Sequence, residues 1–260
     1  MKYFVVADVH GFYDEMKAAL DVAGFDPENE NHTLVSCGDA IDRGKRPNEV
    51  IKYFVNLPRK ILIRGNHEDL LDDLMTSSGP MMHDMQNGTY DTLVQLASKH
   101  CKVNYGTTIS KTYAQLMEFD ELSGYARKEK TYQMYKSLLV DYFETEHYIF
   151  VHGWIPNYSK RDLKDGKLIT RYKYMEGWRN AGPLEWDGAR WSSGIECTMQ
   201  EIFEPNKTIV CGHWHAAAWH TVYEDAEPYA DHSPYVSKNV IALDTCTALS
   251  KKVNVFVIED

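Results

Sequence analysis

The sequence predicts an α/β protein built on a mostly parallel β-sheet, and three observations support this fold class. Short apolar runs alternate with segments of helical periodicity through the first half of the chain. Polar strings follow directly after several of these runs, as happens at the carboxyl ends of strands in open α/β sheets. The last third of the chain again contains short strand-like runs. Strand, helix, strand, helix in that order is typical of a parallel sheet with helices on its faces.

The first half of the chain is expected to supply three buried strands separated by two helices. The strands are expected at residues 3–7, 33–37 and 60–63. Apolar residues recur at helical spacing between Met16 and Ala23, and Gly24 is the expected stop signal. The next linker carries Pro47, and Val50, Ile51 and Phe54 then follow at helical spacing.

The second half is expected to elaborate this core. Residues 69–144 carry apolar and aromatic stripes at helical spacing and predict a helical elaboration. Residues 156–206 are rich in Trp, Gly, Pro and charge, with little periodicity, which predicts a long loop excursion. Further strands are expected at residues 147–151, 208–211, 240–243 and 253–258. No internal repeat is visible, so we expect a single domain over residues 1–260.

Composition and charge disfavour several classes of protein. A formal net charge of −10, from 28 basic and 38 acidic residues, disfavours a broad grip on nucleic acid. No apolar run approaches the roughly 20 residues of a membrane span, and the N-terminal apolar stretch is too short for a signal peptide. The five cysteines include no Cys-x-x-Cys pair. We therefore expect no disulfide framework, no structural zinc site and a cytoplasmic location.

Five polar strings carry the candidate chemistry, and each follows a predicted strand. They are Asp8-Val9-His10-Gly11, Gly38-Asp39-Ala40-Ile41-Asp42-Arg43-Gly44, Gly65-Asn66-His67-Glu68, Val151-His152-Gly153 and Gly212-His213-Trp214-His215. Taken singly, each has a plain structural interpretation as a helix cap, a turn or a loop histidine. Together they supply carboxylates, an amide and imidazoles, the mixed donor set that suits a pair of divalent metal ions. The series favours a metal-dependent hydrolase of phosphate esters.

Local geometry suggests a role for the residues of the first two strings. Asp8 and His10 stand at i and i+2, so both side chains can ligate one ion. Asp39 follows a glycine at a strand end, a natural place for a carboxylate that bridges two ions. The planar fork of Arg43 suits two oxygens of a tetrahedral phosphate.

The later strings add an amide and more imidazoles. Asn66 and His67 are neighbours at a strand-to-helix turn, so one can face a metal while the other faces the leaving group. His213 and His215, spaced i and i+2 after a glycine, have a recognisable metal geometry, whereas His152 alone is a weak signal. Six other histidines are expected to be non-catalytic: His32, His83, His100, His147, His220 and His232.

The strings Asp-x-His-Gly, Gly-Asp-x-x-Asp-Arg-Gly and Arg-Gly-Asn-His-Glu closely resemble those of the calcineurin-like metallophosphoesterase superfamily. Within it they look like the phosphoprotein phosphatase branch, which includes bacteriophage lambda phosphatase and diadenosine tetraphosphatases. The resemblance runs in motif order from Tyr3 to about Ala248, although residues 69–144 and 156–206 carry little that matches. It implies two packed mixed β-sheets flanked by helices, a four-layer sandwich with a dimetal site at its upper edge.

The resemblance also implies a ligand set and a mechanism. Two divalent ions, manganese or else iron, zinc or cobalt, would be held by Asp8, His10, Asp39, Asn66, His152, His213 and His215. A hydroxide bridging the ions would attack phosphorus directly. Arg43 and Asn66 would grip the phosphoryl oxygens. His67 would protonate the leaving group as general acid, and Asp42 would fix the tautomer of His67.

The family resemblance also implies a second phosphate-binding arginine. It is expected in the sequence between the last two histidine strings. Arg190 is the candidate, with Arg179 and Arg171 as alternatives, and both Arg43 and Arg190 are expected to bind substrate. Asp244 resembles a late structural aspartate of the family and is interpreted as support for the site, not as a ligand.

The residues leave the substrate open between two classes. Hydrolysis of phosphate monoesters, of the serine/threonine protein phosphatase type, is the leading expectation, with a phosphorylated protein or a small phosphate ester as partner. A phosphodiesterase or dinucleoside polyphosphate hydrolase, of the diadenosine tetraphosphate type, is the alternative. Gly212-His213-Trp214-His215 favours the alternative, because protein phosphatases usually have Gly-His-Thr-Pro there. All six tryptophans lie in the second half, where they could stack a base or simply pack in the core. A binding module without catalysis is disfavoured, because His67, Arg43 and every expected ligand are present.

Overall fold

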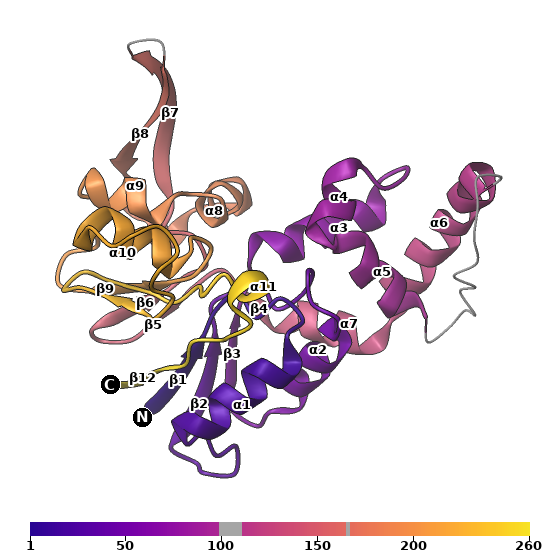
Figure 1. Ribbon diagram of the computed structural model, residues 1–260, viewed down its shortest axis with the longest axis horizontal. Coiled ribbons are helices and arrows are strands. Elements are labelled where there is room, and N and C mark those ends of the chain that lie inside the picture. The colour runs from indigo at the N-terminus through magenta and orange to yellow at the C-terminus, as the bar shows by residue number, and fades with distance from the viewer. Residues whose placement is uncertain (99–110, 165–166) are drawn as a thin grey trace.

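The computed structural model describes residues 1–98, 111–164 and 167–260, and most of its strands form two five-stranded sheets (Figure 1). The first sheet has the order β12-β1-β2-β3-β4. Its strands are Lys2–Val6 (β1), His32–Ser36 (β2), Lys60–Ile63 (β3), Leu139–Val140 (β4) and Phe256–Glu259 (β12). Strands β1 to β4 are parallel, and only β12 runs antiparallel, beside β1. This is the mostly parallel sheet that the first half of the sequence predicts.

The second sheet has the order β10-β11-β9-β6-β5. Its strands are Phe143–Glu144 (β5), Tyr148–Phe150 (β6), Thr208–Cys211 (β9), Tyr235–Val236 (β10) and Val240–Ala242 (β11). The three central strands β11, β9 and β6 are parallel, and the two edge strands are antiparallel. Their carboxyl ends therefore meet at one edge, as they do in the first sheet.

Helices cover the outer face of each sheet. The helices on the side of the first sheet are Tyr13–Ala23 (α1), Pro47–Asn56 (α2), Asn66–Thr76 (α3), Met82–Asn87 (α4), Thr89–Ala97 (α5), Lys111–Lys128 (α6) and Lys130–Leu138 (α7). Residues of α1, α2, α3, α5, α6 and α7 join its hydrophobic core, whereas α4 packs on α5. Against the second lie Pro183–Arg190 (α8), Gly194–Met199 (α9) and Ala216–Glu224 (α10), with the 3-10 turn Trp178–Asn180 (η1) nearby. The short helix Thr247–Ser250 (α11) precedes β12. Gly24 ends α1 in a left-handed conformation, as predicted.

The two sheets pack face to face, which gives the four-layer sandwich that the family resemblance implies. Phe4 and Val6 of β1 face the helices, whereas Val5 between them faces the second sheet. The layer between the sheets holds a cluster of buried apolar side chains that includes Val5, Val35, Ile63, Phe150, Val210, Ile241 and Ile258. This shared core fixes the relative position of the two sets of strand ends.

Residues 156–206 differ from the expected loop excursion. They begin with a hairpin, Asn157–Lys164 (β7) and Lys167–Tyr174 (β8), which projects away from the body of the protein (Figure 1). They continue through η1, α8 and α9. In the described part of the chain the two strands of the hairpin pair only with each other. Leu163 and Leu168 near its tip are exposed, whereas Tyr172 and Tyr174 near its base pack against the core of the second sheet.

The helical elaboration at 69–144 is also shorter than expected at its end. Helix α7 stops at Leu138, and Phe143 belongs to strand β5 instead of continuing the helical stripe. His100, Cys101 and Gly106 lie outside the described residues. The other four cysteines are free. In the part of the chain that the structure describes, no helix combines the length and apolarity needed to cross a membrane.

Candidate metal centre

The polar strings meet where β1, β2, β3, β6 and β9 end. Backbone hydrogen bonds tie the strings to one another: the amide of Asp8 donates to Gly38, that of His10 to Asp39, and that of Gly212 to His152. The distances are 3.2, 2.9 and 2.9 Å. Strings that are far apart in the sequence thus form one loop cluster at the common edge of both sheets.

Backbone strain is concentrated in this cluster. Among the described residues, twelve that are not glycine have a positive φ, between 48° and 72°. Six of the twelve are expected site residues: Asp8, His10, Asp39, Asp42, Arg43 and His213. A left-handed conformation costs a non-glycine residue about 1–3 kcal/mol, and such strain gathers at functional sites. The tertiary structure, and not local preference, therefore sets the direction of these side chains.

Asp39 lies at the centre of the cluster. Its Oδ2 atom is 3.5 Å from the Nε2 of His152 and 3.8 Å from the Nε2 atoms of both His10 and His67. Its Oδ1 accepts a hydrogen bond from the backbone amide of His67 at 2.9 Å. One oxygen is thus fixed by the protein, and the other points at three imidazoles. This is the position from which a carboxylate can bridge two ions.

Two imidazoles are oriented by backbone carbonyls. His10 donates from Nδ1 to the carbonyl of Ile41 at 2.9 Å, and His152 donates from Nδ1 to that of Cys37 at 2.8 Å. These bonds leave each Nε2 with its lone pair facing the cluster, the arrangement found in metal-ligating histidines. The Nε2 of His152 also lies 2.7 Å from the Oδ1 of Asn66. Acceptor atoms that converge in this way suit a cation.

Two overlapping groups of residues could hold a metal ion. In each group the candidate ligand atoms all lie within 4.8 Å of one another, and Asp39 belongs to both. The groups are His10, Asp39 and His67, and Asp39, His152 and His213. Asp8 adjoins the first group, with its Oδ1 3.9 Å from the Nε2 of His10.

His215 stands apart from both groups. Its Nε2 is 3.8 Å from the Oδ2 of Asp244, and its side chain is 32% exposed. The Oδ1 of Asp244 accepts a hydrogen bond from the amide of Cys246 at 2.7 Å, which holds this buried carboxylate in place. His215 therefore lies next to Asp244, the expected supporting residue, and not next to Asp39.

Burial controls the ionisation of the candidate ligands. Burial, together with the nearby His67, lowers the pKa of His10 well below its usual value. Burial and the neighbouring His152 lower the pKa of His213 to about 3. Both imidazoles are therefore neutral near pH 7, which is the form that binds metals.

The two central carboxylates respond in opposite directions. Burial, with the charges of Asp244 and Asp39, raises the pKa of Asp8 well above its usual value. Burial also opposes ionisation of Asp39, but His152, His67 and His10 outweigh it and hold the pKa of Asp39 below its usual range. A cation between the two carboxylates would relieve the repulsion that acts on Asp8.

His67 and Asp42 form a buried pair beside the cluster. The Nδ1 of His67 donates to the Oδ2 of Asp42 at 2.7 Å. The hydroxyls of Thr89 and Thr92 on α5 donate to the two oxygens of Asp42, each at 2.7 Å. Burial favours neutral His67, but Asp39 and Asp42 outweigh it and raise its pKa. The pair is arranged to hold a proton on this imidazole.

Arg43 lies at the exposed rim of the cluster. One of its terminal nitrogens donates to the Nε2 of His67 at 3.1 Å. The guanidinium therefore stands next to the ring atom from which a general acid would deliver its proton. Its other N–H groups can donate hydrogen bonds to a ligand bound at the cluster.

The side chain of Glu68, in the third string, accepts hydrogen bonds that link the second string to the third. Its carboxylate accepts hydrogen bonds from the amides of Asp39, Ala40 and Gly65, at 3.1, 3.0 and 2.8 Å. The hydroxyl of Tyr135 donates to the same carboxylate at 3.1 Å. Glu68 is fully buried and positions the loop that carries Asp39.

Two motif glycines are required by close approach. A Cβ atom on Gly212 would stand 2.0 Å from the Oδ2 of Asp8, and one on Gly65 would stand 2.1 Å from the Oδ1 of Asp39. Either contact is far too short for a side chain. Glycine at these positions therefore lets the candidate ligands come together.

The three arginines considered as second phosphate ligands all form ion pairs with carboxylates. The guanidinium of Arg190 forms ion pairs with Asp69 and Asp141, and it contacts none of the expected metal ligands in the described part of the chain. Arg179 pairs with Glu144 and Glu204, and Arg171 pairs with Asp162 on the hairpin. In this structure carboxylates distant in sequence take up the donors of Arg190, and its assignment as a phosphate ligand stays a prediction.

The six tryptophans divide into two sets. Four are buried in the core: Trp154, Trp178, Trp186 and Trp219. Trp191 and Trp214 are 48% and 42% exposed, and both contact His213, with ring centroids 5.9 and 6.3 Å apart and the rings nearly perpendicular. The two exposed tryptophans thus both stand at the rim of the metal cluster.

Sequence analysis missed the partners that orient the acid pair. Thr89 and Thr92 lie three residues apart on the buried face of α5, where polar side chains are unusual. That spacing within an apolar stripe is the signal that could have marked them. Glu68 belongs to the third string, but its role could not be predicted because its partners Asp39, Ala40 and Tyr135 are distant in the chain.

Two packed sheets thus carry carboxylates and imidazoles at their common edge. The model of the calcineurin-like phosphoesterase family matches residues 1–217, so the chain belongs to that family.

Curated relatives match shorter stretches. A bis(5'-nucleosyl)-tetraphosphatase [asymmetrical] of Bacillus subtilis (strain 168) is 37% identical over 76 residues, which is 26% of this chain and 31% of that protein. Serine/threonine-protein phosphatase 2 of Salmonella typhimurium is 34% identical over 93 residues, or 35% of this chain and 41% of that protein. The matches thus span less than half the length of these relatives.

Solved structures show the same fold. A cold-active protein tyrosine phosphatase superposes with a TM-score of 0.52 and 15% identity, over 99% of this chain and 73% of that chain. At this identity the likeness concerns the fold alone.

Proposed function

We propose that this chain is a dimetal-dependent phosphoesterase that hydrolyses phosphate monoesters, of the serine/threonine protein phosphatase type, by direct attack of water at phosphorus. The observation that carries the proposal is the position of Asp39, whose Oδ2 lies 3.5–3.8 Å from three imidazole Nε2 atoms. A carboxylate so placed can serve two ions at once. The donor set fits Mn²⁺, Fe²⁺, Zn²⁺ or Co²⁺.

The residues that would hold the ions follow from these distances. Asp8, His10 and Asp39 would hold one ion. Asp39, Asn66, His152 and His213 would hold the other. His215 would join only by turning away from Asp244. When bound, such a pair of ions would activate water and offset charge on the phosphoryl group.

Arg43 would bind the phosphoryl oxygens. Its guanidinium now donates to the Nε2 of His67, a neutral acceptor. A phosphoryl group carries negative charge and offers two oxygens to the planar fork, so it competes strongly for the same donors. Binding of substrate would therefore draw Arg43 toward phosphate and free the Nε2 of His67.

His67 would then protonate the leaving oxygen. Asp42 accepts the Nδ1 proton at 2.7 Å, so the proton that can be transferred sits on Nε2 when the ring is charged. The raised pKa of His67 favours that charged form. Asp42 stabilises the imidazolium and fixes the ring orientation while both of its own oxygens stay hydrogen-bonded to threonine hydroxyls.

A second candidate function is hydrolysis of dinucleoside polyphosphates. It is favoured by Trp191 and Trp214, whose exposed rings flank His213 and could stack a nucleobase. Turnover of a phosphopeptide, diadenosine tetraphosphate and bis-p-nitrophenyl phosphate, measured side by side, separates the substrate classes. Preference for the phosphopeptide supports the first candidate, and preference for the dinucleotide supports the second.

Hydrolysis of p-nitrophenyl phosphate tests the proposed reaction. We expect turnover in the presence of Mn²⁺, its loss after chelation, and its return when Mn²⁺ is added back. The metal content of the chelated protein is measured in the same samples. Undiminished turnover by protein shown to be metal-free would contradict the proposal.

A further inference from the structure

A groove extends from the rim of the metal cluster along the first sheet's loops. It has a volume of about 380 Å³. Its lining comes from three places in the sequence: the loop after β1 with the start of α1, the Arg43–Arg46 loop before α2, and Lys251 after α11. Arg43, which would bind the reacting phosphate, is one of the lining residues. The groove therefore shares a residue with the candidate active site.

The charge of this lining is positive, in a chain whose formal net charge is −10. The cationic side chains are Arg43, Lys45, Arg46 and Lys251, and the acidic ones are Asp14 and Glu15. Arg46 and Asp14 form an ion pair at 2.5 Å, so their charges offset one another. Three cations then face a single carboxylate, that of Glu15.

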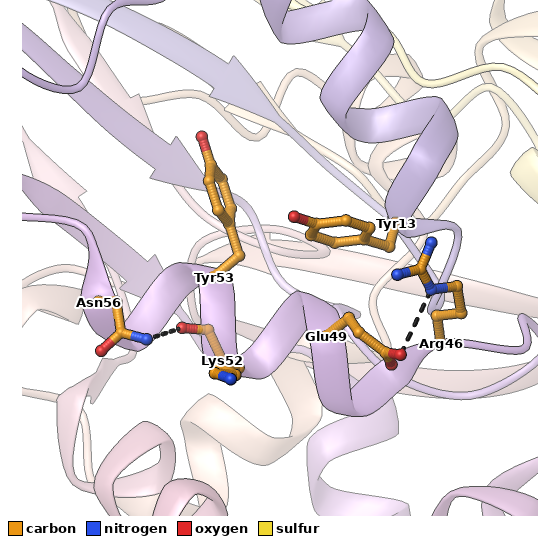
Figure 2. A pocket seen from close by; sticks show the side chains of 6 residues that line it. All are labelled: Tyr13, Arg46, Glu49, Lys52, Tyr53 and Asn56. Carbon is orange, nitrogen blue, oxygen red and sulfur yellow. Dashed lines mark hydrogen bonds and ion pairs between the residues drawn. The ribbon is translucent and has the colours of Figure 1, made fainter.

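Arg46 separates this groove from a second hollow of about 320 Å³ between α1 and α2, shown in Figure 2. Its guanidinium lies 4.7 Å from the ring centroid of Tyr13, and its Nε is 3.4 Å from a carboxylate oxygen of Glu49 (Figure 2). Arg46 is therefore paired with two carboxylates, and of these Asp14 lines the groove while Glu49 lines the second hollow. The positive charge that remains belongs to the groove on the side of Arg43.

The two lysines of the groove are placed differently. The ammonium of Lys251 lies 4.7 Å from the ring centroid of Phe12 and donates to the carbonyl of Ala248 at 2.5 Å, so its position is fixed. Lys45 is exposed, two residues after Arg43. An ammonium group acts as a point charge for phosphate, and two of them beyond a guanidinium suit further phosphates joined directly to the first.

We propose that this groove binds the polyphosphate chain of a nucleoside or dinucleoside polyphosphate, with Lys45 and Lys251 holding the phosphates beyond the one that reacts. The inference rests on the proposed function, because it takes the reacting phosphate to lie at Arg43. Three cations in one short groove match the charge density of linked phosphates. Acidic side chains on a peptide are spaced more widely.

The double variant Lys45→Gln/Lys251→Gln tests this groove. We expect kcat/KM for diadenosine tetraphosphate, divided by kcat/KM for p-nitrophenyl phosphate, to fall about 5- to 30-fold, as two partly exposed ion pairs of 0.5–1 kcal/mol each would give. Lys252→Gln is the matched control, because Lys252 is exposed beside Lys251 but does not line the groove. The control should leave the ratio unchanged.

A second readout does not depend on turnover. Binding of inorganic tripolyphosphate to metal-free protein, followed by calorimetry, should weaken by a similar factor in the double variant and not in Lys252→Gln. If no phosphate ester is hydrolysed with Mn²⁺, the proposed function fails, while this titration still tests the groove. Unchanged tripolyphosphate affinity and an unchanged ratio would overturn the inference. A loss confined to phosphopeptides with acidic flanks would also overturn it and assign the groove to peptide.

Discussion

The Nε2 of His152 lies 3.5 Å from the Oδ2 of Asp39, although the two residues belong to different sheets. Asp39 follows β2 of the first sheet, and His152 follows β6 of the second. Both side chains are buried. The apolar layer between the sheets, with Val35 and Phe150 among its members, sets this distance. The candidate metal centre is therefore a product of sheet packing as much as of its loops.

His67→Asn tests the general acid. The amide keeps some of the volume but cannot deliver the proton, so kcat should fall about 10²- to 10⁴-fold. Metal content should stay the same, because the proposed ligand set does not include His67. Steady-state kinetics and elemental analysis of the same preparation measure both quantities. Loss of metal in this variant would show that His67 is a ligand, as its membership of one candidate group allows.

Thr92→Val tests the support of the acid pair. Its hydroxyl donates to Asp42 at 2.7 Å, and Asp42 is fully buried. Removing the partner of a buried carboxylate should lower the free energy of unfolding by about 1–3 kcal/mol. The rate should also depend more steeply on the pKa of the leaving group, because His67 would be held less well. Thr221→Val, which loses only a bond to the carbonyl of Ala217 in the same helix, is the control.

Glu144→Gln tests the structural role of Arg179. Hydrogen bonds from Arg179 and Lys207 lower the pKa of Glu144 to about 2. Because this folded-state pKa lies below the ordinary value of 4.5, the stabilisation is complete above pH 4.5 and is lost as the pH falls toward 2. We expect the variant to lose about 1–2 kcal/mol at pH 7, after allowance for solvent screening.

The same variant should show a flatter loss of stability between pH 4.5 and 2, measured by denaturant unfolding. Glu146→Gln, at an exposed neighbouring position, should follow the wild type. Arg179→Ala should likewise reduce stability and leave kcat/KM unchanged. A 100-fold fall in kcat/KM for Arg179→Ala would instead show that this arginine reaches the phosphate.

Trp191→Ala tests the second candidate function. Stacking of a base on an aromatic side chain is worth about 1–3 kcal/mol, so affinity for adenosine monophosphate should fall about 5- to 150-fold if this ring holds a nucleobase. Affinity for inorganic phosphate serves as the internal reference. Leu184→Ala, 85% exposed on helix α8, which ends directly before Trp191, is the matched control. Equal affinities for the nucleotide in wild type and Trp191→Ala would remove the observation that favours dinucleotides.

The mostly parallel sheet and the cluster could be predicted from sequence because their signals are local, whereas the packing of two sheets is implied by the family resemblance. A strand of four or five apolar residues followed by Asp8 or Asp39 places a carboxylate at a strand end. The i, i+2 spacing of Asp8 and His10 is likewise visible in the letters. Parallel strands then bring such ends together without any further information.

The remainder depends on contacts that no local pattern encodes. Arg190 is taken up by Asp69 and Asp141, which lie 121 and 49 residues away in the chain. The β7–β8 hairpin exposes Leu163 and Leu168 near its tip, and only the part of β8 near Tyr172 and Tyr174 alternates between partly buried and exposed side chains. The groove next to Arg43 is lined in part by Lys251, which is about 200 residues away in the sequence, so no local pattern predicts it.

Electron paramagnetic resonance of the Mn²⁺-loaded protein tests the central claim most directly, namely that two ions share the carboxylate of Asp39. We predict that the wild type binds two equivalents of Mn²⁺ and shows the signal of a spin-coupled pair. Asp39→Asn should lose that coupling. A wild-type protein that binds a single Mn²⁺, or two with uncoupled spectra, would contradict the account.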